Sequence, residues 1–290
     1  MVKASVQSEL THASSCSYEP YSVLMSVYYK EQPDFLNASI HSILMQTIPC
    51  DEFVIVCDGL LTPDLNQVLN NFLSNSDIQI KLVRLKENVG LGKALNIGIK
   101  HCKNSLIARM DSDDISFPDR CQKQLKIFKS NNVDITSGVV CEFIKEPGDI
   151  CIHRTLPIYH ENIVKYAQVR NPFNHPCTMF RKEAVERAGG YMHFPLLEDY
   201  YLWIRMFMTG AKSMNSHESM LHMRIGDGMH RRRGGLSYLR SIISFHYWMF
   251  NVGFTELFTF LKVSFAHTVV CLIPTRLRKV LFFKYLRKSI

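Results

Sequence analysis

Three aspartates within four positions, Asp111, Asp113 and Asp114, directly follow the apolar run of residues 106–110. Such a run predicts a buried strand, whose end would hold the carboxylates at a rigid edge. Carboxylate oxygens are the ligands that Mg²⁺ and Mn²⁺ prefer, and an Asp-x-Asp pair leaves coordination positions open for water and substrate phosphates. The stretch therefore predicts a divalent-metal site. An acidic turn that caps a following helix would contain the same residues.

Residues 116–118 (SFP) favour a helix that begins directly after the acidic stretch. The serine or an aspartate would cap this helix, and the proline would lie in its first turn. Within the stretch we therefore expect Asp113 to bind the metal and Asp111 to support it, whereas Asp114 caps the helix. Arg109 would form an ion pair with Asp111 or reach a phosphate.

The elements before the acidic stretch alternate between apolar runs and helical patterns. The four predicted strands are residues 22–28, 53–57, 80–85 and 106–110. Helical spacing of apolar residues between them predicts three helices, and this alternation is typical of a parallel sheet with helices on both faces. Ligands of such sheets bind beyond the carboxyl ends of the strands, where Tyr28, Asp58 and the acidic stretch all fall.

Shorter elements follow the acidic stretch. The predicted helices are residues 120–129, 160–169, 181–188 and 200–209, and the predicted strands are residues 133–144, 150–155, 177–180 and 220–225. A proline-pinned loop that contains His175 precedes the strand at residue 177, and Glu198 and Asp199 precede the helix at residue 200. The glycines at 90 and 92 do not complete a dinucleotide-binding loop, because Leu95 occupies the position of the third glycine.

The basic character of the chain belongs to its last 60 residues. Residues 231–290 contain eleven Lys and Arg against one acidic residue, a net charge of +10, whereas the whole chain carries +8 and residues 1–230 therefore −2. This distribution predicts that the tail, and not the body, contacts an anionic surface. Nucleic acid is not expected as a partner, because the body is not basic and contains no nucleic-acid-binding motif.

Helical patterns at residues 236–250, 253–273 and 274–290 predict a basic, aromatic helical tail. The second pattern contains Lys262 near its centre, which costs about 2.5–3.5 kcal/mol in a membrane span. We therefore expect a helix that lies in the membrane interface and does not cross the bilayer. Its buried side would contain Phe254, Leu257, Phe258, Leu261 and Phe265. A helical cap packed on the catalytic domain is the alternative.

The N-terminal residues and the cysteines indicate further properties of the chain. Residues 1–20 are polar, lack the apolar core of a signal peptide, and predict a disordered lead-in. The nine cysteines are scattered and form no CxxC pair, which favours buried thiols in a reducing cytoplasm over a disulfide scaffold or a zinc site.

Seven short motifs resemble those of the family 2 glycosyltransferases, over residues 20 to about 235. They are residues 26–28 (SVY), 42–47 (SILMQT), 55–59 (IVCDG), 88–96 (NVGLGKALN), 108–118 (ARMDSDDISFP), 174–181 (NHPCTMFR) and 198–205 (EDYYLWIR). Within that family the chain is similar to the bacterial exopolysaccharide and O-antigen branch, including the amylovoran-type transferases. The resemblance implies a GT-A fold, a three-layer α/β/α fold, with a nucleotide-binding half at residues 21–118 and an acceptor half at 119–235.

The resemblance also implies a role for each matching residue. Asp199 would be the catalytic base for the acceptor hydroxyl, although a Glu-Asp pair at a helix start is also a common cap. The other roles would be Asp113 and Asp111 on Mn²⁺ or Mg²⁺; Tyr28, Asp58, Lys93 and Asp111 on the nucleotide; His230, Arg232 and Arg233 on the diphosphate; and His175, Glu198 and Arg109 in the sugar or acceptor pocket. Cys57 departs from the aspartate that is common before Asp58, which leaves Asp58 alone for this contact.

The function that the resemblance implies is inverting, metal-dependent transfer of one hexose from a nucleotide sugar. UDP-galactose or UDP-glucose is the expected donor, and a sugar on a polyprenyl pyrophosphate is the expected acceptor. The β-linked product would belong to an O-antigen, lipopolysaccharide, capsule or exopolysaccharide repeat unit. The QxxRW motif of processive members is absent, which favours transfer of a single sugar. The enzyme would be peripheral on the cytoplasmic face of the bacterial inner membrane, with residues 236–290 as its contact.

Two other functions are compatible with an acidic edge on an α/β sheet. A sugar-1-phosphate nucleotidyltransferase should contain a glycine-rich phosphate loop near its N-terminus, and residues 27–33 do not supply one. A non-catalytic sugar-binding membrane protein would have no need for both Asp113 and Asp199, and the presence of both argues against it.

Overall fold

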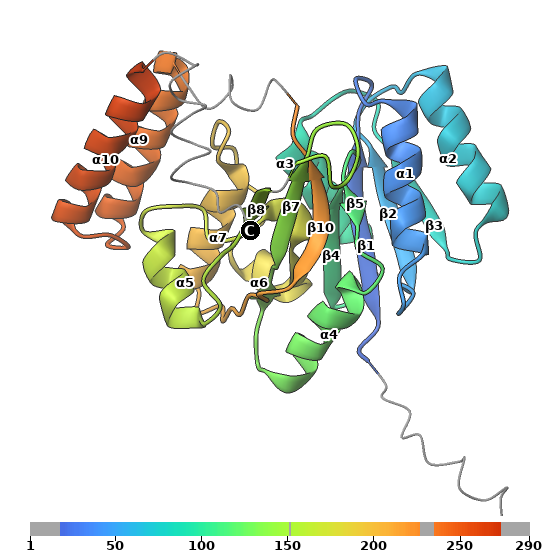
Figure 1. Ribbon diagram of the computed structural model, residues 1–290, viewed down its shortest axis with the longest axis horizontal. Coiled ribbons are helices and arrows are strands. Elements are labelled where there is room, and N and C mark those ends of the chain that lie inside the picture. The colour runs from blue at the N-terminus through green and yellow to red at the C-terminus, as the bar shows by residue number, and fades with distance from the viewer. Residues whose placement is uncertain (1–17, 151, 227–234, 274–290) are drawn as a thin grey trace, which may run out of the picture.

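A six-stranded mixed sheet runs through the computed structural model, which describes residues 18–150, 152–226 and 235–273 (Figure 1). Its strands, in spatial order, are β3 (Ile80–Arg84), β2 (Glu52–Cys57), β1 (Tyr21–Val27), β4 (Leu106–Asp111), β9 (Met179–Arg181) and β6 (Ile135–Thr136). The first four are parallel, whereas β9 runs antiparallel to β4 and β6. The predicted parallel α/β sheet is therefore confirmed.

Helices cover both faces of this sheet, because successive residues of a strand point to opposite sides. Val23 and Met25 of β1 face one apolar core, and Leu24 faces the other. The first core is covered by α1 (Pro33–Leu44), α2 (Pro63–Asn75) and α4 (Arg120–Ser130). The second is covered by α3 (Leu91–His101), α5 (His160–Ala167), α6 (Lys182–Arg187) and α7 (Glu198–Met208). The expected three layers are present.

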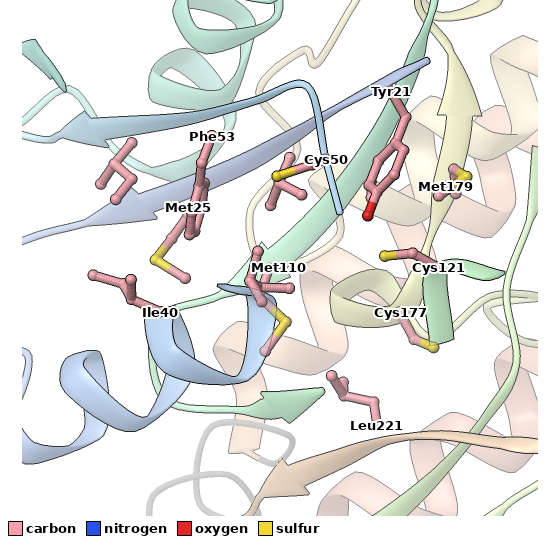
Figure 2. Close-up of a cluster of buried hydrophobic side chains, with 14 of the residues drawn as sticks. Tyr21, Met25, Ile40, Cys50, Phe53, Met110, Cys121, Cys177, Met179 and Leu221 are labelled. Carbon is pink, nitrogen blue, oxygen red and sulfur yellow. The ribbon is translucent and has the colours of Figure 1, made fainter. Parts of the chain in front are cut away.

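Figure 2 shows part of the first core, where the sheet, α1 and α4 meet. Ile40 of α1 lies next to Met25 of β1, and the Tyr21 ring points toward Cys121 of α4. Cys121 and Cys177 are buried free thiols and act here as small packing groups. The continuous apolar runs of β1, β2 and β4 are explained by their burial on both faces.

A four-stranded sheet packs against the end of the first core, in the order β5 (Ile115–Ser116), β10 (Ser219–Arg224), β7 (Val139–Phe143) and β8 (Ile152–Arg154). The prediction of one strand over residues 133–144 is wrong, because β6 belongs to the large sheet and β7 to the small one. The chain crosses between the sheets at Ser137, whose N–H donates to Asn215 Oδ1 at 3.0 Å. A short 3₁₀ turn, η1 (His175–Cys177), precedes β9.

The predicted helix start at residues 116–118 is also wrong. Residues 115 and 116 pair with β10, and α4 begins at Arg120 with Asp119 as the preceding residue. Asp114 does not cap α4, because its Oδ1 accepts from Arg224 N at 2.8 Å instead. The tertiary pairing of β5 with β10 thus overrides the local preference for a capped helix.

The tail forms a helical hairpin of α9 (Gly235–Asn251) and α10 (Leu257–Leu272) beside α7 (Figure 1). α9 packs on α7 through a third apolar cluster that includes Phe245, Met249 and Tyr200. Phe254, predicted to enter the membrane, stacks on Phe207 of α7 at a ring-centroid distance of 6.4 Å. In the part of the chain that the structure describes, no helix is both long and apolar enough to cross a membrane.

Candidate active site

The three aspartates of the acidic loop converge at the carboxyl end of β4. One carboxylate oxygen from each of Asp111, Asp113 and Asp114 lies within 4.8 Å of the others. Asp111 and Asp113 are half-buried, and Asp114 is only 1% exposed. The expected pair of metal-binding carboxylates is therefore part of a group of three, which includes the residue that we expected to cap a helix.

Helix α1 holds the acidic loop from one side. Ser39 Oγ donates to Asp111 O at 2.8 Å, and Ser42 Oγ accepts from Ser116 N at 3.0 Å. Gln46, two residues after the end of α1, donates from its Nε2 to Phe117 O at 2.7 Å. These bonds satisfy backbone groups that strand pairing leaves open. They also give a physical reason for the polar residues in the motif at 42–47.

The small sheet holds the same loop from the other side through Arg224, the last residue of β10. Its N–H bonds to Asp114, and its Nε donates to Asp113 O at 3.1 Å. The local sequence around Arg224 does not indicate this role, because its partners lie 110 and 111 positions earlier in the chain. The acidic loop is thus held between two parts of the fold.

The cluster of three carboxylates has the electrostatic properties of a cation site. Burial, together with the charges of Asp111 and Glu31, raises the pKa of Asp113 to about 7. Burial and the charge of Asp113 raise the pKa of Asp114, whose Oδ2 has no hydrogen-bond partner among the described residues. A divalent cation would remove the repulsion and give this oxygen a partner, and the all-oxygen donor set suits Mg²⁺ or Mn²⁺. The residues present therefore fit such an ion.

Arg109 lies on β4 directly beside this group and is only 1% exposed. Its Nη2 donates to Asp111 Oδ1, which is the predicted ion pair. Its Nε and Nη1 have no hydrogen-bond partner among the residues that the structure describes. A buried guanidinium with two free donor atoms is costly without a ligand. The structure thus places two buried, unpaired donors of Arg109 next to the three carboxylates.

The predicted nucleotide contacts lie at the same edge of the sheet. Asp58 at the end of β2 is buried, and its carboxylate accepts from Val89 N at 2.7 Å and Gly90 N at 3.1 Å. Asp58 therefore shapes the loop that leads into α3. Lys93 in the first turn of α3 is exposed, and Tyr28 after β1 is 42% exposed. Their contacts with a nucleotide stay predictions.

Tyr191 contacts His175, which is one of the residues predicted for the sugar or acceptor pocket. The Tyr191 hydroxyl lies 2.8 Å from His175 Nε2. Burial, and to a smaller extent Arg109, lowers the pKa of His175 well below its ordinary value, so the imidazole is neutral at neutral pH. The side-chain amide of Asn96 on α3 accepts from Tyr191 N at 2.7 Å and donates to Tyr191 O at 2.6 Å. Helix α3 thus fixes the position of Tyr191.

The amino end of α7 contains the predicted base. Glu198 and Asp199 lie in the first turn of this helix, and Asp199 Oδ2 accepts from Asn171 Nδ2 at 2.6 Å. Burial raises the pKa of Tyr191, and the charges of Asp199 and Asp111 raise it further. Burial raises the pKa of Glu198.

The structure brings Asp111, Asp113, Asp114 and Arg109 together at the end of β4, and it shows contacts of further residues that the predictions from sequence do not include. These further residues are Asn96, Asn171, Tyr191 and Arg224. Asn96 ends the motif at 88–96, and Tyr191 follows two glycines with positive φ, so a signal existed for both. The predicted diphosphate contacts His230, Arg232 and Arg233 lie outside the described residues.

The chain is similar in sequence to known glycosyltransferases. Residues 22–189 match the model of glycosyl transferase family 2. The chain is 35% identical over 92% of its length to a UDP-Gal:alpha-D-GlcNAc-diphosphoundecaprenol beta-1,3-galactosyltransferase of Escherichia coli, of which it covers 97%. It is 33% identical over 91% of its length to the amylovoran biosynthesis glycosyltransferase AmsE of Erwinia amylovora, of which it covers 98%.

A solved glycosyltransferase structure has a similar fold. The chain matches a mannosyltransferase from Pyrobaculum calidifontis, in complex with GDP-Man and Mn²⁺, with a TM-score of 0.63 at 16% identity. The match covers 93% of this chain and 82% of that one. The predicted GT-A fold is confirmed, and the nucleotidyltransferase and non-catalytic alternatives are set aside. With its acidic edge, its α/β sheet and its relatives, the chain belongs to glycosyl transferase family 2.

Proposed function

We propose that this glycosyltransferase is inverting and metal-dependent, and that it moves one hexose from UDP-galactose or UDP-glucose to a sugar on a polyprenyl pyrophosphate. The β-linked product is part of an O-antigen, capsule or exopolysaccharide repeat unit. The observation that carries this proposal is that one carboxylate oxygen from each of Asp111, Asp113 and Asp114 lies within 4.8 Å of the others, a donor set that suits a divalent cation. Asp199, in the first turn of α7 and hydrogen-bonded to Asn171, is the proposed base.

In this proposal the protein performs three tasks around the bond that breaks. Asp113, Asp111 and Asp114 would hold a divalent ion, which when bound would stabilise the charge of the departing diphosphate by several kcal/mol. The free donors of Arg109 bind oxygens of the donor substrate. Asp199 accepts the proton of the acceptor hydroxyl as that oxygen attacks the anomeric carbon, and the bond to Asn171 holds its carboxylate in place. A single displacement converts an α-linked donor into a β-linked product.

The substrates are proposed from the relative in Escherichia coli, whose name includes UDP-Gal and an alpha-D-GlcNAc-diphosphoundecaprenol. The similarity extends over nearly the whole of both chains, so it includes both the nucleotide half and the acceptor half. A hydrophobic acceptor of this kind is confined to a membrane surface. The enzyme therefore has to work at that surface, on the cytoplasmic side where nucleotide sugars are made.

The outer face of α10 supports a peripheral membrane contact. Phe258 and Phe265 are 76% and 73% exposed, and the exposed Leu257, Leu261 and Leu272 extend the same stripe. A helix with such a stripe lies in the membrane interface with the apolar side chains among the acyl chains. This assignment rests on α10 alone, because Phe254 and most of α9 pack on the catalytic domain.

The transfer reaction is tested with the purified full chain, UDP-galactose or UDP-glucose, Mn²⁺ and a synthetic GlcNAc-pyrophosphoryl-lipid. We expect a product one hexose heavier by mass spectrometry and a β-anomeric proton by NMR. Asp199→Asn should lower the rate about 10²–10⁴-fold and leave UDP binding intact. Asp51→Asn, which changes an exposed ion pair with Lys103, is the matched control. Full activity in Asp199→Asn, or an α-linked product, would overturn the assignment of the base.

The membrane contact is tested by flotation with vesicles of phosphatidylethanolamine and phosphatidylglycerol. Phe258→Ser with Phe265→Ser should weaken partitioning at least about tenfold, since a fully buried Phe contributes about 1.5–3 kcal/mol. Leu73→Ser, at an exposed apolar position on α2, is the control. Unchanged partitioning of the double variant would remove α10 as the membrane contact but leave the reaction proposal standing.

A further inference from the structure

Arg224 connects the acidic loop with the small sheet, and the proposed reaction assigns it no chemical role. It is the last residue of β10, and three of its donor atoms bond to two separate segments. Its backbone N donates to Asp114 Oδ1 at 2.8 Å, and its Nε donates to Asp113 O at 3.1 Å. Its Nη1 donates to Lys145 O at 3.1 Å, just beyond β7. One side chain thus ties the acidic loop to the small sheet.

Two aromatic rings fix the Arg224 guanidinium in this place. It lies 3.7 Å from the ring centroid of Phe35 on α1 and 4.4 Å from that of Phe143 on β7. A planar guanidinium that stacks on such rings keeps its N–H donors in a plane parallel to the rings. A lysine ammonium is not planar and is not fixed in this way. Because Phe35 and Phe143 come from the two sides of the acidic loop, the stack also joins α1 to the small sheet.

The acidic loop needs this support because its own pairing is short. β5 has two residues, and it pairs with β10 only at Ile115 and Ser116. Asp113 lies outside that pairing, and the Arg224 side chain is the hydrogen-bond partner of its carbonyl oxygen. Three carboxylates within 4.8 Å repel one another, so a loop without this support would let them separate.

We propose that Arg224 is a positioning residue for the metal, holding the Asp113–Asp114 peptide so that the three carboxylates converge before the cation binds. The inference rests on the metal dependence proposed above and adds a residue whose side chain bonds to the Asp113 backbone and not to a carboxylate. Residues that orient metal ligands typically contribute about 10–100-fold in metal affinity. Loss of the Arg224 side chain should therefore weaken metal binding, and excess metal should restore turnover.

The test compares Arg224→Met with the wild-type full chain. Methionine keeps an unbranched side chain between the two rings, but it has no charge and no donors, and the backbone bond to Asp114 remains. Mn²⁺ binding in the presence of UDP is measured by the EPR signal of free Mn²⁺, and transfer is measured across a Mn²⁺ titration. We expect an Mn²⁺ dissociation constant at least about tenfold higher, with kcat at saturating Mn²⁺ within about threefold of wild type.

Arg181→Met is the matched control. Arg181 also lies over a phenylalanine, 5.4 Å from the Phe128 ring, and its Nη1 and Nη2 donate to Glu19 at 3.0 and 3.3 Å. Its removal should leave Mn²⁺ binding unchanged. If Arg224→Met does not fold, Arg224→Lys, which keeps the charge and the stem, should give a smaller loss of Mn²⁺ affinity.

The outcomes separate this inference from the proposed function. Wild-type Mn²⁺ affinity in the folded Arg224 variant, or an equal loss in Arg181→Met, would overturn the positioning role and leave the metal-dependent transfer standing. A wild-type enzyme that binds no Mn²⁺ and transfers sugar in EDTA would overturn the proposed metal dependence and this inference with it. A loss of turnover that excess Mn²⁺ does not restore, with normal Mn²⁺ affinity, would also contradict the positioning role.

Discussion

The acidic edge of the large sheet and the α9–α10 hairpin bury polar groups in opposite ways. At the acidic edge, Asp114 and Arg109 are each 1% exposed and Arg120 is fully buried. Arg120 Nη2 donates to Arg109 O at 2.6 Å, and Asp114 accepts from Arg224. In the hairpin, His246 is also 1% exposed, but neither ring nitrogen has a hydrogen-bond partner among the described residues.

This difference shows what each region is built to do. Hydrogen bonds are directional, so a network of buried charged groups fixes atoms in position as well as compensating for lost hydration. Apolar packing tolerates small shifts and needs no such network. The acidic edge is therefore a rigid frame for chemistry, with Arg109 and Asp114 still offering free polar atoms. The hairpin is an apolar body whose outer stripe, including Phe258 and Phe265, is exposed.

The largest expected effect is at the acidic edge. Asp113→Asn removes one of the three converging carboxylates and should lower transfer about 10³-fold, because several kcal/mol of charge stabilisation are lost. The measurement is the transfer rate at saturating donor, together with Mn²⁺ binding. Asp119→Asn, which removes only a partly exposed ion pair with Lys123, should stay within about fivefold. Equal losses in both variants would mean that the edge is not a specific metal site.

In the hairpin the expected effect is on stability. Phe245 is fully buried and lies 4.5 Å from the Tyr200 ring and 5.3 Å from the Phe194 ring, centroid to centroid. Phe245→Ala should lower the free energy of unfolding by about 3–5 kcal/mol in urea denaturation. Phe258→Ala, at a 76% exposed position of the same hairpin, should change it by at most about 0.5 kcal/mol. Similar changes in both would show that α9 does not belong to the domain core.

The sequence predicts the first half of the fold well because its evidence there is local. β1, β2 and β4 are continuous apolar runs, and each of the three parallel crossovers contains one helix. The second half depends on contacts that local patterns do not contain. The crossing at Ser137 splits one apolar stretch between two sheets, and it depends on Asn215, 78 positions later.

The same division applies to the site. Asp111, Asp113 and Asp199 stand out because a strand end or a helix start places them at an edge. Arg224 does not stand out, because a lone cation in an apolar strand has many explanations until its partners in the acidic loop are known. Tertiary pairing likewise explains why Asp114 joins the cluster of three carboxylates and does not cap α4.

Acid should destabilise the hairpin in particular. Burial, and then His267, lowers the pKa of His246 to about 3, against about 6.5 in the unfolded chain. Below pH 6.5 the unfolded state binds a proton that the folded state excludes, so stability falls as pH falls, by about 2 kcal/mol between pH 7 and pH 5. Burial also lowers the pKa of His267, which adds a loss of the same sign.

His246→Leu should therefore remove about 2 kcal/mol of the difference in unfolding free energy between pH 7 and pH 5. The measurement is urea denaturation at both values of pH. His217→Leu changes an exposed histidine and should leave the full difference in place. If His246→Leu keeps the wild-type difference, the buried His246 is not the group responsible for the acid sensitivity.

The smallest expected effect compares one hydroxyl from each region. Tyr191→Phe keeps the ring but removes the hydrogen bond to His175 Nε2, which contributes about 1 kcal/mol. Because His175 then loses a partner that orients it, kcat/KM should fall about fivefold, and the unfolding free energy should fall by about 1 kcal/mol. Tyr247→Phe removes a hydroxyl on a 53% exposed hairpin residue and should alter neither quantity. Equal losses in kcat/KM would mean that rigid positioning is not confined to the acidic edge, since the hairpin would then contribute to it as well.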